Sequence, residues 1–224
     1  MYISHLGHSA VLVETERARI LIDPGNFSAD WHDLMDLDAV VVTHAHLDHV
    51  DPQWVPRLIE RNPSARVLVE PGVPEILDCP QAEVFPAGST TVIQGAVIEA
   101  VGGLHAVIHP EIPRIGNIGI VIRTVSEPTF FHPGDALDIV PNEVDILAVP
   151  AHGPWCAMRE IIDFIRAVDA GAGFLIHDGL LNERGWALSF SRFNEMTGTI
   201  FTDLRSGAPT DFNRTVEDEV EDER

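Results

Sequence analysis

One short stretch, VVTHAHLDHVDP at residues 41–52, constrains this chain more than any other. It places four ionisable side chains directly after an apolar run, at His44, His46, Asp48 and His49. Side chains two apart in an extended segment point the same way, so the first two histidines converge on one point. The aspartate and the third histidine follow after the chain turns, and reach a second point beside the first. Burying four such groups without partners is costly, and metal coordination removes that cost.

Imidazoles and carboxylates suit zinc and similar divalent ions. The pattern therefore predicts a metal site rather than a polar loop that is rich in histidine by chance. Three later apolar runs each lead to a further candidate: His105 in VGGLHAVIH, Asp135 in TFFHPGD and His177 in FLIHDG. Each is expected at a strand terminus, where loops build functional sites. His109, four residues after His105, is the competing candidate for the third histidine.

The run THAHLDH at residues 43–49 resembles the signature of the metallo-β-lactamase superfamily. Upstream, LGHSAVLVE and ILIDPG are similar to the opening strands of that superfamily, especially in the branch that resembles L-ascorbate-6-phosphate lactonase. The later histidine, aspartate and histidine follow in the superfamily's order. The resemblance covers nearly the whole chain. It implies an α/β fold, a four-layer αββα sandwich of two mixed sheets flanked by helices, with a two-metal site along one edge.

The resemblance also implies seven metal ligands. The first ion would be held by His44, His46 and His105, and the second by Asp48, His49 and His177. Asp135 would bridge both ions. Two divalent ions would lower the pKa of a bridging water, and the resulting hydroxide would attack a carbonyl carbon or a phosphorus. Asp48 is the implied catalytic residue, because it can orient the hydroxide and accept its proton. Zinc is the expected cofactor, and manganese and iron suit the same donors.

Three other residues stay open on the sequence alone. His8 in GHS either contacts the substrate or supports a ligand, or it is a hydrogen-bonded core histidine. Asp23 in LIDPG either orients a ligand histidine, as carboxylates near metals often do, or simply forms a turn. His152 in PAHGPW either lines the pocket or lies in a surface loop.

The chain has 224 residues, enough for one large domain or two small ones. Because no low-complexity linker interrupts it, we expect one domain over residues 1–213 and a disordered acidic tail over 214–224. A helix is predicted to start at Pro52 with Asp51 as its N-cap, and a second over 158–168. Strands are predicted at 2–7, 10–15, 19–23, 37–43, 66–70, 89–93, 96–103, 118–124, 129–132, 144–150 and, as the last one, 171–179.

The net charge of −21 disfavours nucleic acid as a partner. Without the last eight residues, 29 acidic and 13 basic side chains remain, so the body itself carries −16. No apolar run is long enough for a membrane span, and no signal peptide is evident. Cys79 and Cys156 are too few for a disulfide framework, so we expect two separate thiols in a cytoplasmic protein.

The most economical function is hydrolysis of a small ester, lactone or phosphoester by a metal-dependent enzyme. A diiron oxidoreductase of similar fold is disfavoured, because such proteins are expected to carry a carboxylate where this chain has His46. A nucleic-acid-processing hydrolase conflicts with the acidic body, and a non-catalytic metal sensor would be favoured by missing ligands. The substrate stays unidentified: the candidate loops offer only Arg114, Arg123 and Arg184, and no long lid insertion is evident. The sequence is compatible with a homo-oligomer.

Overall fold

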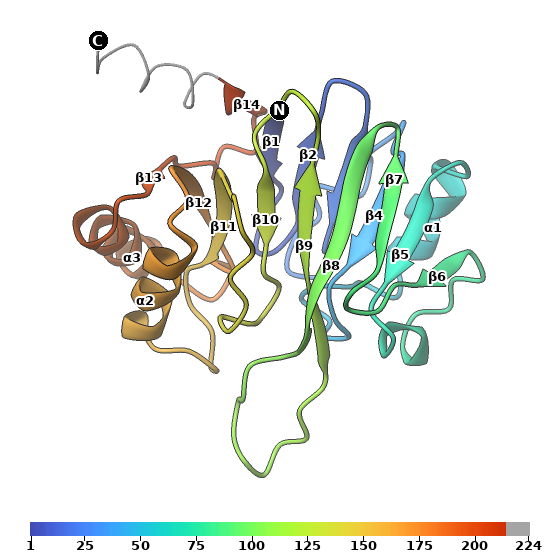
Figure 1. Cartoon of the computed structure of the whole chain (residues 1–224). Coiled ribbons are helices and arrows are strands. Elements are labelled where there is room, and N and C mark those ends of the chain that lie inside the picture. The colour runs from blue at the N-terminus through green and yellow to red at the C-terminus, as the bar shows by residue number, and fades with distance from the viewer. Residues whose placement is uncertain (214–224) are drawn as a thin grey trace.

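A computed structural model describes residues 1–213, so the expected acidic tail lies outside the described residues. Two seven-stranded sheets pack face to face, the second in front of the first in Figure 1. The first has the order β14-β1-β2-β3-β4-β5-β6, formed by Thr210–Asp211, Tyr2–His5, Val11–Glu14, Arg19–Ile22, Ala39–Val42, Arg66–Val69 and Ala82–Val84. The second has the order β13-β12-β11-β10-β9-β8-β7, formed by Ile200–Phe201, Ala172–Ile176, Ile146–Pro150, Phe130–His132, Gly116–Arg123, Ala96–Leu104 and Thr90–Ile93.

The two sheets repeat one pattern of pairing. From β14 to β6, and again from β7 to β13, the first three pairings are antiparallel and the next three are parallel. Strands β8, β10 and β12 therefore run in the same direction. Their carboxyl ends, together with that of β4, carry the polar residues that the sequence singles out.

Alternation along each strand separates the inner core from the outer ones. Ala39 and Val41 of β4 join the core between the sheets, whereas Val40 and Val42 join the core on the outer face of the first sheet. This period of two places a side chain on each face in turn, and both faces of β4 are covered. The apolar run that precedes His44 therefore forms a strand that is buried on both faces.

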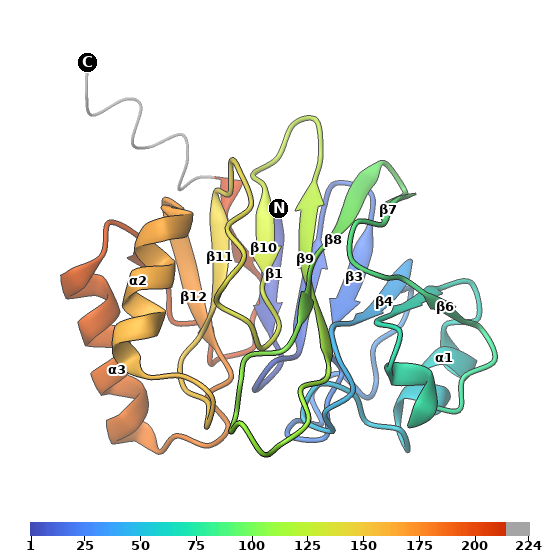
Figure 2. The same cartoon turned by 60° about the horizontal axis from the view of Figure 1, so that its bottom comes forward.

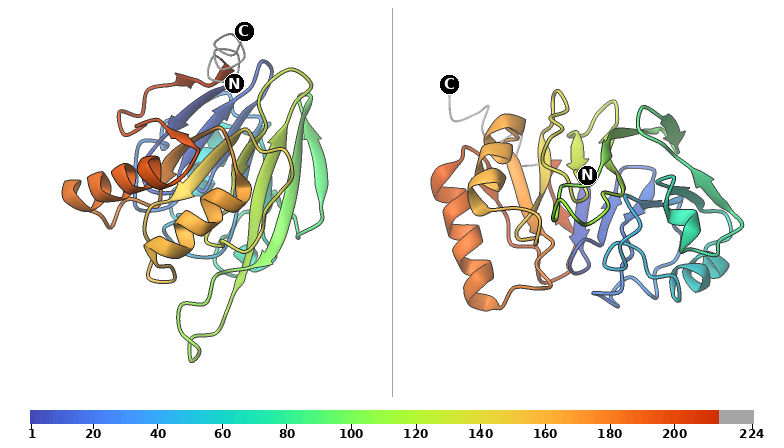
Figure 3. Two further views of the ribbon diagram at one scale, coloured as in Figure 1. Left: turned by 60° about the vertical axis from the view of Figure 1, so that its left-hand side comes forward. Right: turned by 90° about the horizontal axis from the view of Figure 1, so that it is seen from below.

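Three helices cover the outer faces: α1 (Val55–Arg61), α2 (Met158–Val168) and α3 (Glu183–Met196). The buried face of α1 packs in the outer core of the first sheet, and that of α2 and α3 in the outer core of the second. Seen from below, the sheets lie between α2 and α3 on one side and α1 on the other (Figure 3, right), and Figure 2 shows the same separation. The four-layer αββα sandwich is confirmed.

Three local predictions differ from the structure. The first helix begins at Val55 rather than Pro52, although Asp51 makes the hydrogen bonds expected of an N-cap. Its carboxylate accepts the N–H groups of Gln53 and Trp54, and its carbonyl accepts the N–H of Val55. The whole of α3 was missed. Asn182 caps it by accepting the N–H groups of its first turn, and Trp186, Phe190 and Phe193 follow helical spacing. The glycine and serines of the segment lower its helix propensity. Strand β12 is not the last, because the short strands β13 and β14 follow it.

Cys79 and Cys156 are both free thiols, as expected from their number and spacing. Among residues 1–213, no helix has the length and apolar character that crossing a membrane requires. Because these two cysteines form no disulfide bond, the described part of the chain is stabilised by its three apolar cores.

Helix α3 gives a direct test of this architecture. Phe193 is fully buried and lies with its ring 6.0 Å from that of Phe201, so Phe193→Ala should lower the free energy of unfolding by about 3–5 kcal/mol. Leu188 on the exposed face of the same helix is the matched control, and Leu188→Ala should cost no more than about 0.5 kcal/mol. Chemical denaturation measures both, and equal losses would contradict the placement of α3.

Candidate metal centre

Every candidate ligand lies at one edge of the sandwich, just beyond the end of a strand. His44, His46, Asp48 and His49 follow β4, and the other three follow β8, β10 and β12: His105, Asp135 and His177. Two groups form there, and within each the potential ligand atoms lie within 4.8 Å of one another. One consists of His44, His46, His105 and Asp135, the other of His8, Asp48, His49 and His177.

The Asp135 carboxylate lies between the two groups. Its Oδ2 is 3.3 Å from Nε2 of His105 and 3.2 Å from Nε2 of His177. Its Oδ1 is 3.1 Å from Nε2 of His49, and Nε2 of His44 lies 3.8 Å from Oδ2. One buried carboxylate thus faces imidazoles from both groups, which is the position of a bridging group.

Three neighbours hold Asp135 in place. The indole N–H of Trp155 donates to Oδ2 at 2.8 Å, and the Asp135 backbone N–H donates to Oδ1 of Asn117 at 2.9 Å. Gly134 has a φ of +61°, and a Cβ there would lie 2.3 Å from the same Asn117 oxygen. The tight turn therefore requires glycine. Trp155 and Asn117 were not predicted, because nothing local in the sequence links them to Asp135.

Hydrogen bonds at the far nitrogens orient the histidine rings. Nδ1 of His49 donates to Asp23 at 2.6 Å, and Nδ1 of His105 donates to the Ala106 carbonyl at 2.7 Å. Nδ1 of His177 donates to the backbone carbonyl of His152 at 2.5 Å. Each bond fixes the proton on Nδ1 and leaves the Nε2 lone pair for a metal, the arrangement that metal-binding histidines usually show.

These contacts answer two of the open questions. Asp23 is fully buried and supports a site histidine, and it also accepts the Thr43 N–H and hydroxyl at 2.8 and 2.7 Å. Since Thr43 directly precedes the first site histidine, Asp23 positions the start of the whole segment. His152 takes part through its backbone only, because its side chain is exposed.

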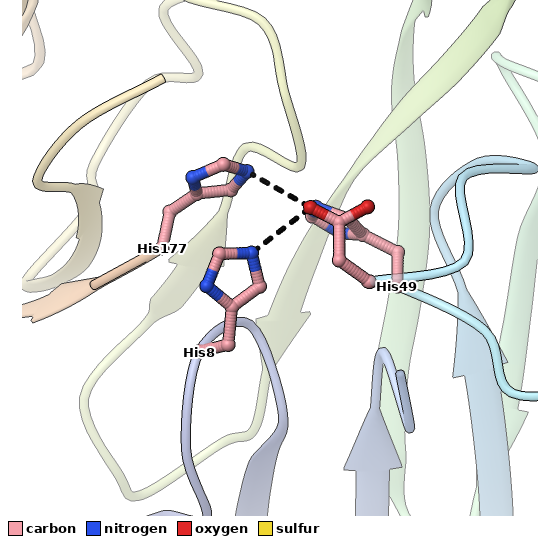
Figure 4. Close-up of side chains that lie close together, drawn as sticks. His8, His49 and His177 are labelled. Atoms are coloured by element: carbon pink, nitrogen blue, oxygen red, sulfur yellow. Dashed lines mark hydrogen bonds and ion pairs between the residues drawn. The ribbon is translucent and has the colours of Figure 1, made fainter. Parts of the chain in front are cut away.

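His8 belongs to the second group by distance, but its hydrogen bonds give it another role. The backbone N–H of Gly179 donates to His8 Nδ1 at 3.0 Å, so the ring proton must be on Nε2. That Nε2 lies 3.0 Å from Oδ2 of Asp48, and Nε2 of His177 lies 3.6 Å from the same oxygen (Figure 4). His8 is therefore a hydrogen-bond donor to Asp48, with no lone pair left to offer a metal.

The charges of the site follow from burial and proximity. Burial alone would raise the pKa of Asp48, but the hydrogen bond from His8 and the charge of His49 outweigh it and lower that pKa to about 2. Asp135 likewise has its pKa held well below the ordinary value despite burial, chiefly by the charge of His49. Both carboxylates are therefore ionised at neutral pH.

The histidines differ in the direction of their pKa shifts, because their neighbours differ. Burial lowers the pKa of His44 well below its ordinary value, and the nearby His49 lowers it further. Burial also lowers the pKa of His46, so both rings are neutral, the form that binds metals. His49 has its pKa raised well above the ordinary value, because the charges of Asp135 and Asp23 outweigh the effect of burial.

The donors fit divalent metal ions. Nε2 of His105 and Nε2 of His177 are buried without a hydrogen-bond partner of good geometry, although both point toward Asp135. Native proteins rarely leave buried polar atoms in this state, and a metal ligand is one of the few chemical reasons for it. Imidazole nitrogens around ionised carboxylates match the preferences of zinc, manganese and iron.

His109 lies outside both groups. It is exposed in the β8–β9 loop, residues 105–115, where its Nδ1 accepts the N–H of Glu111 at 3.2 Å. That loop projects from the edge of the sandwich at the bottom of Figure 1. The sequence analysis did not predict this projecting loop beside His105.

Comparisons with known proteins agree with this picture. The family model described as a β-lactamase superfamily domain matches residues 2–172. Protein Rv0786c of Mycobacterium tuberculosis is 38% identical over 202 residues, which cover 90% of this chain and 95% of that protein. A UPF0173 metal-dependent hydrolase of Brucella ovis is 31% identical over 150 residues, 60% of this chain and 62% of its own length.

The fold has solved relatives as well. Igni18, a metallo hydrolase from the archaeon Ignicoccus hospitalis, superimposes with a TM-score of 0.70 at 15% identity, over 93% of this chain and 97% of that one. The chain belongs to the β-lactamase superfamily domain family, a class of metal-dependent hydrolases that share the metallo-β-lactamase fold. The resemblance predicted from residues 43–49 and the expectation of an enzyme of this class are confirmed.

Gly25 in the LIDPG turn provides a test of how the site is supported. A Cβ at Gly25 would lie 1.9 Å from the Asp48 carbonyl oxygen, so Gly25→Ala must push the ligand segment away. We expect the free energy of unfolding to fall by about 1–3 kcal/mol and metal uptake to weaken. Gly171 has no atom within 4 Å of such a Cβ, and Gly171→Ala is the matched control. Calorimetric metal titration with thermal unfolding compares them, and indistinguishable variants would refute the close contact.

Proposed function

We propose that this protein is a metal-dependent hydrolase that uses two metal ions to cleave a small ester, lactone or phosphoester. The observation that carries the proposal is the buried Asp135 carboxylate, whose two oxygens face imidazoles of both groups. A single-metal or purely structural site would not need a shared carboxylate between two sets of donors. The membership of the β-lactamase superfamily supports the same class of chemistry.

The proposed ligands are those of the sequence analysis, namely His44, His46 and His105 for the first ion, Asp48, His49 and His177 for the second, and Asp135 for both. Their convergence at one edge supports this assignment. The hydrogen bond from Gly179 supports leaving His8 out of the ligand set. We propose zinc as the ion, because imidazole dominates the donor set.

When bound, the two ions would lower the pKa of a water molecule and polarise the substrate oxygen. The chain's own residues prepare the remaining steps. Asp48, kept ionised at neutral pH, can accept a proton from the attacking water, and His8 fixes the direction of its carboxylate. Trp155 holds Asp135 and covers it from solvent.

Two alternatives conflict with the character of this chain. A nucleic-acid-processing hydrolase would have to bring a polyanion to a protein of net charge −21. A sensor without catalysis would not need an ionised aspartate with its own hydrogen-bond donor beside the ligands. The proposal also includes a small-molecule substrate and a cytoplasmic location, which the two free thiols support.

The first expected outcome concerns metal content. Protein purified without chelator and analysed by elemental mass spectrometry should contain about two divalent ions per chain, with zinc prevailing. Removal by chelator should lower the melting temperature, because the ionised carboxylates of Asp48 and Asp135 would lose the positive charge of the ions. Trace metal in the native protein, with no uptake on reconstitution, would eliminate the proposal.

Substitution can decide whether His105 or His109 is the third histidine ligand of the first site. His105→Ala should reduce bound metal from about two ions to about one or fewer, because a first-site ligand is lost. His109→Ala is the control, since that side chain is exposed in the same loop and should leave metal content unchanged. The reverse result would assign the ligand to His109.

Asp48→Asn separates catalysis from metal binding. Asparagine keeps the shape and one oxygen, but loses the charge and the ability to accept a proton. We expect kcat for any ester or lactone that is hydrolysed to fall about 10²–10⁴-fold. The first-site metal should remain, measured by elemental analysis. Retention of more than about a tenth of the activity would exclude Asp48 from the proton transfer.

A further inference from the structure

Large, exposed apolar side chains occur on the segments next to the candidate ligands. Six residues of this kind occur on the loops that carry or flank the candidate ligands, each 48–55% exposed: Phe27, Leu47, Leu104, Val107, Ile112 and Leu180. We call them the apolar rim. Scattered exposed apolar residues are ordinary, whereas a group around a functional site indicates a binding surface.

One half of the apolar rim borders the second group of donors. The Phe27 ring lies 4.7 Å from the His8 ring, and Leu47 stands between His46 and Asp48 in the chain. Leu180 directly follows Gly179, whose N–H bonds His8. These three residues therefore lie on the segments next to the partly exposed Asp48.

The other half borders a cavity beside the first group. Leu104, Val107 and Ile112 lie in or at the start of the projecting β8–β9 loop. A cavity of about 570 Å³ opens next to this loop, lined by the apolar side chains of Val107, Leu137, Trp155 and Phe164. Its volume lies in the range of small-molecule sites. Val107 also lines a smaller hollow together with Ile112 and the candidate ligands His46 and His105, so the cavity adjoins the metal centre at the β8–β9 loop.

The charges around this cavity disfavour an anion. Its only lining cation is Arg114, which donates to the His105 carbonyl and lies 3.7 Å from the Asp138 carboxylate. Glu160 and Asp163 also line the cavity, so acidic groups outnumber basic ones there. A phosphate or carboxylate in this cavity would find no unpaired cation, because Arg114 already lies beside Asp138. The carboxylates of Glu160 and Asp163 would also repel it.

We infer that the substrate is a neutral ester, thioester or lactone with an apolar acyl group, and that this group occupies the cavity between the β8–β9 loop and Trp155. The inference rests on the proposed hydrolase function and narrows it, because phosphoesters and anionic lactones are excluded. Val107 and Ile112 are the specificity-determining residues. The reaction that supplies this substrate must join a carboxylic acid, whose remaining chain is apolar and uncharged, to an alcohol or a thiol.

The test uses the metal-loaded full-length protein and 4-nitrophenyl esters that share one leaving group. From acetyl through butyryl to octanoyl, kcat/KM should rise about fourfold for each added methylene, the gain expected of a methylene that leaves water. The suberyl monoester has the same chain length as octanoyl but ends in a carboxylate, and kcat/KM should be at least about tenfold lower. A flat series, or equal rates for octanoyl and suberyl, would overturn the inference.

Substitutions locate the effect. Val107→Ser combined with Ile112→Ser should flatten the chain-length series, so that kcat/KM for the octanoyl ester exceeds that for the acetyl ester by less than about twofold. Val125 is the control, because it is fully exposed at the opposite end of β9, and Val125→Ser should leave the series intact. The double variant could instead change the molar mass of the protein in solution while kcat/KM still rises with chain length. In that case the apolar rim joins two copies of the chain, and the inference is wrong.

A binding measurement separates this inference from the proposed function. Acetohydroxamate and octanohydroxamate share a metal-binding group and differ only in the apolar chain. Octanohydroxamate should bind the metal-loaded protein at least about tenfold more tightly by calorimetry, and the double variant should lose that advantage. Tight binding of the long chain without hydrolysis of any ester would reject the hydrolase and retain the apolar site. Equal affinities would reject the apolar site, whatever the activity.

Discussion

The contact between the buried Asp135 carboxylate and imidazoles from separate strand ends is the interaction on which this edge of the molecule depends. An ionised carboxylate removed from water is stable only where donors and positive charge surround it. Here His49 comes from the end of β4, His105 from β8 and His177 from β12, and each approaches Asp135 within 3.3 Å. The two sheets are thereby joined at one edge by electrostatics, in addition to the apolar core between them.

A second buried carboxylate makes that arrangement geometrically possible. Asp23 accepts hydrogen bonds from the backbone and hydroxyl of Thr43 and from the ring of His49, so it fixes both ends of the ligand segment. The adjacent Gly25 lets this turn approach the Asp48 backbone more closely than any side chain would allow. The DPG turn and the histidine segment form one rigid unit, and this rigidity explains why polar groups can be concentrated there.

The site and its surroundings have opposite characters. At the centre, ionised carboxylates and imidazoles are arranged for divalent metal ions, whereas the entrance exposes leucine, valine, isoleucine and phenylalanine. A metal centre can attack many kinds of ester, so the selection among substrates has to come from the loops that surround it. An apolar entrance on a protein of strongly negative charge favours neutral molecules over phosphorylated ones, which is consistent with the acidic side chains around the cavity.

The sequence by itself determined what depends on neighbouring positions. The apolar run of β4, the apolar stripe of α2 and the spacing from His44 to His49 are local patterns, and they predicted a buried strand, a helix and a metal site. The resemblance of residues 43–49 to a known superfamily implied the sandwich and the later ligands. Helix α3 was not predicted because Gly185 and the serines lower the helix propensity of the segment, although Trp186, Phe190 and Phe193 follow helical spacing.

Only the tertiary structure decided the partners of each donor. Trp155 reaches Asp135 across 20 positions, and Gly179 fixes the proton of His8 across 171. The backbone carbonyl of His152, rather than its side chain, orients His177. No local pattern encodes such contacts, because they arise when strand ends far apart in the chain meet at one edge. There, the position of each histidine ring proton is set by the nearest hydrogen-bonding group.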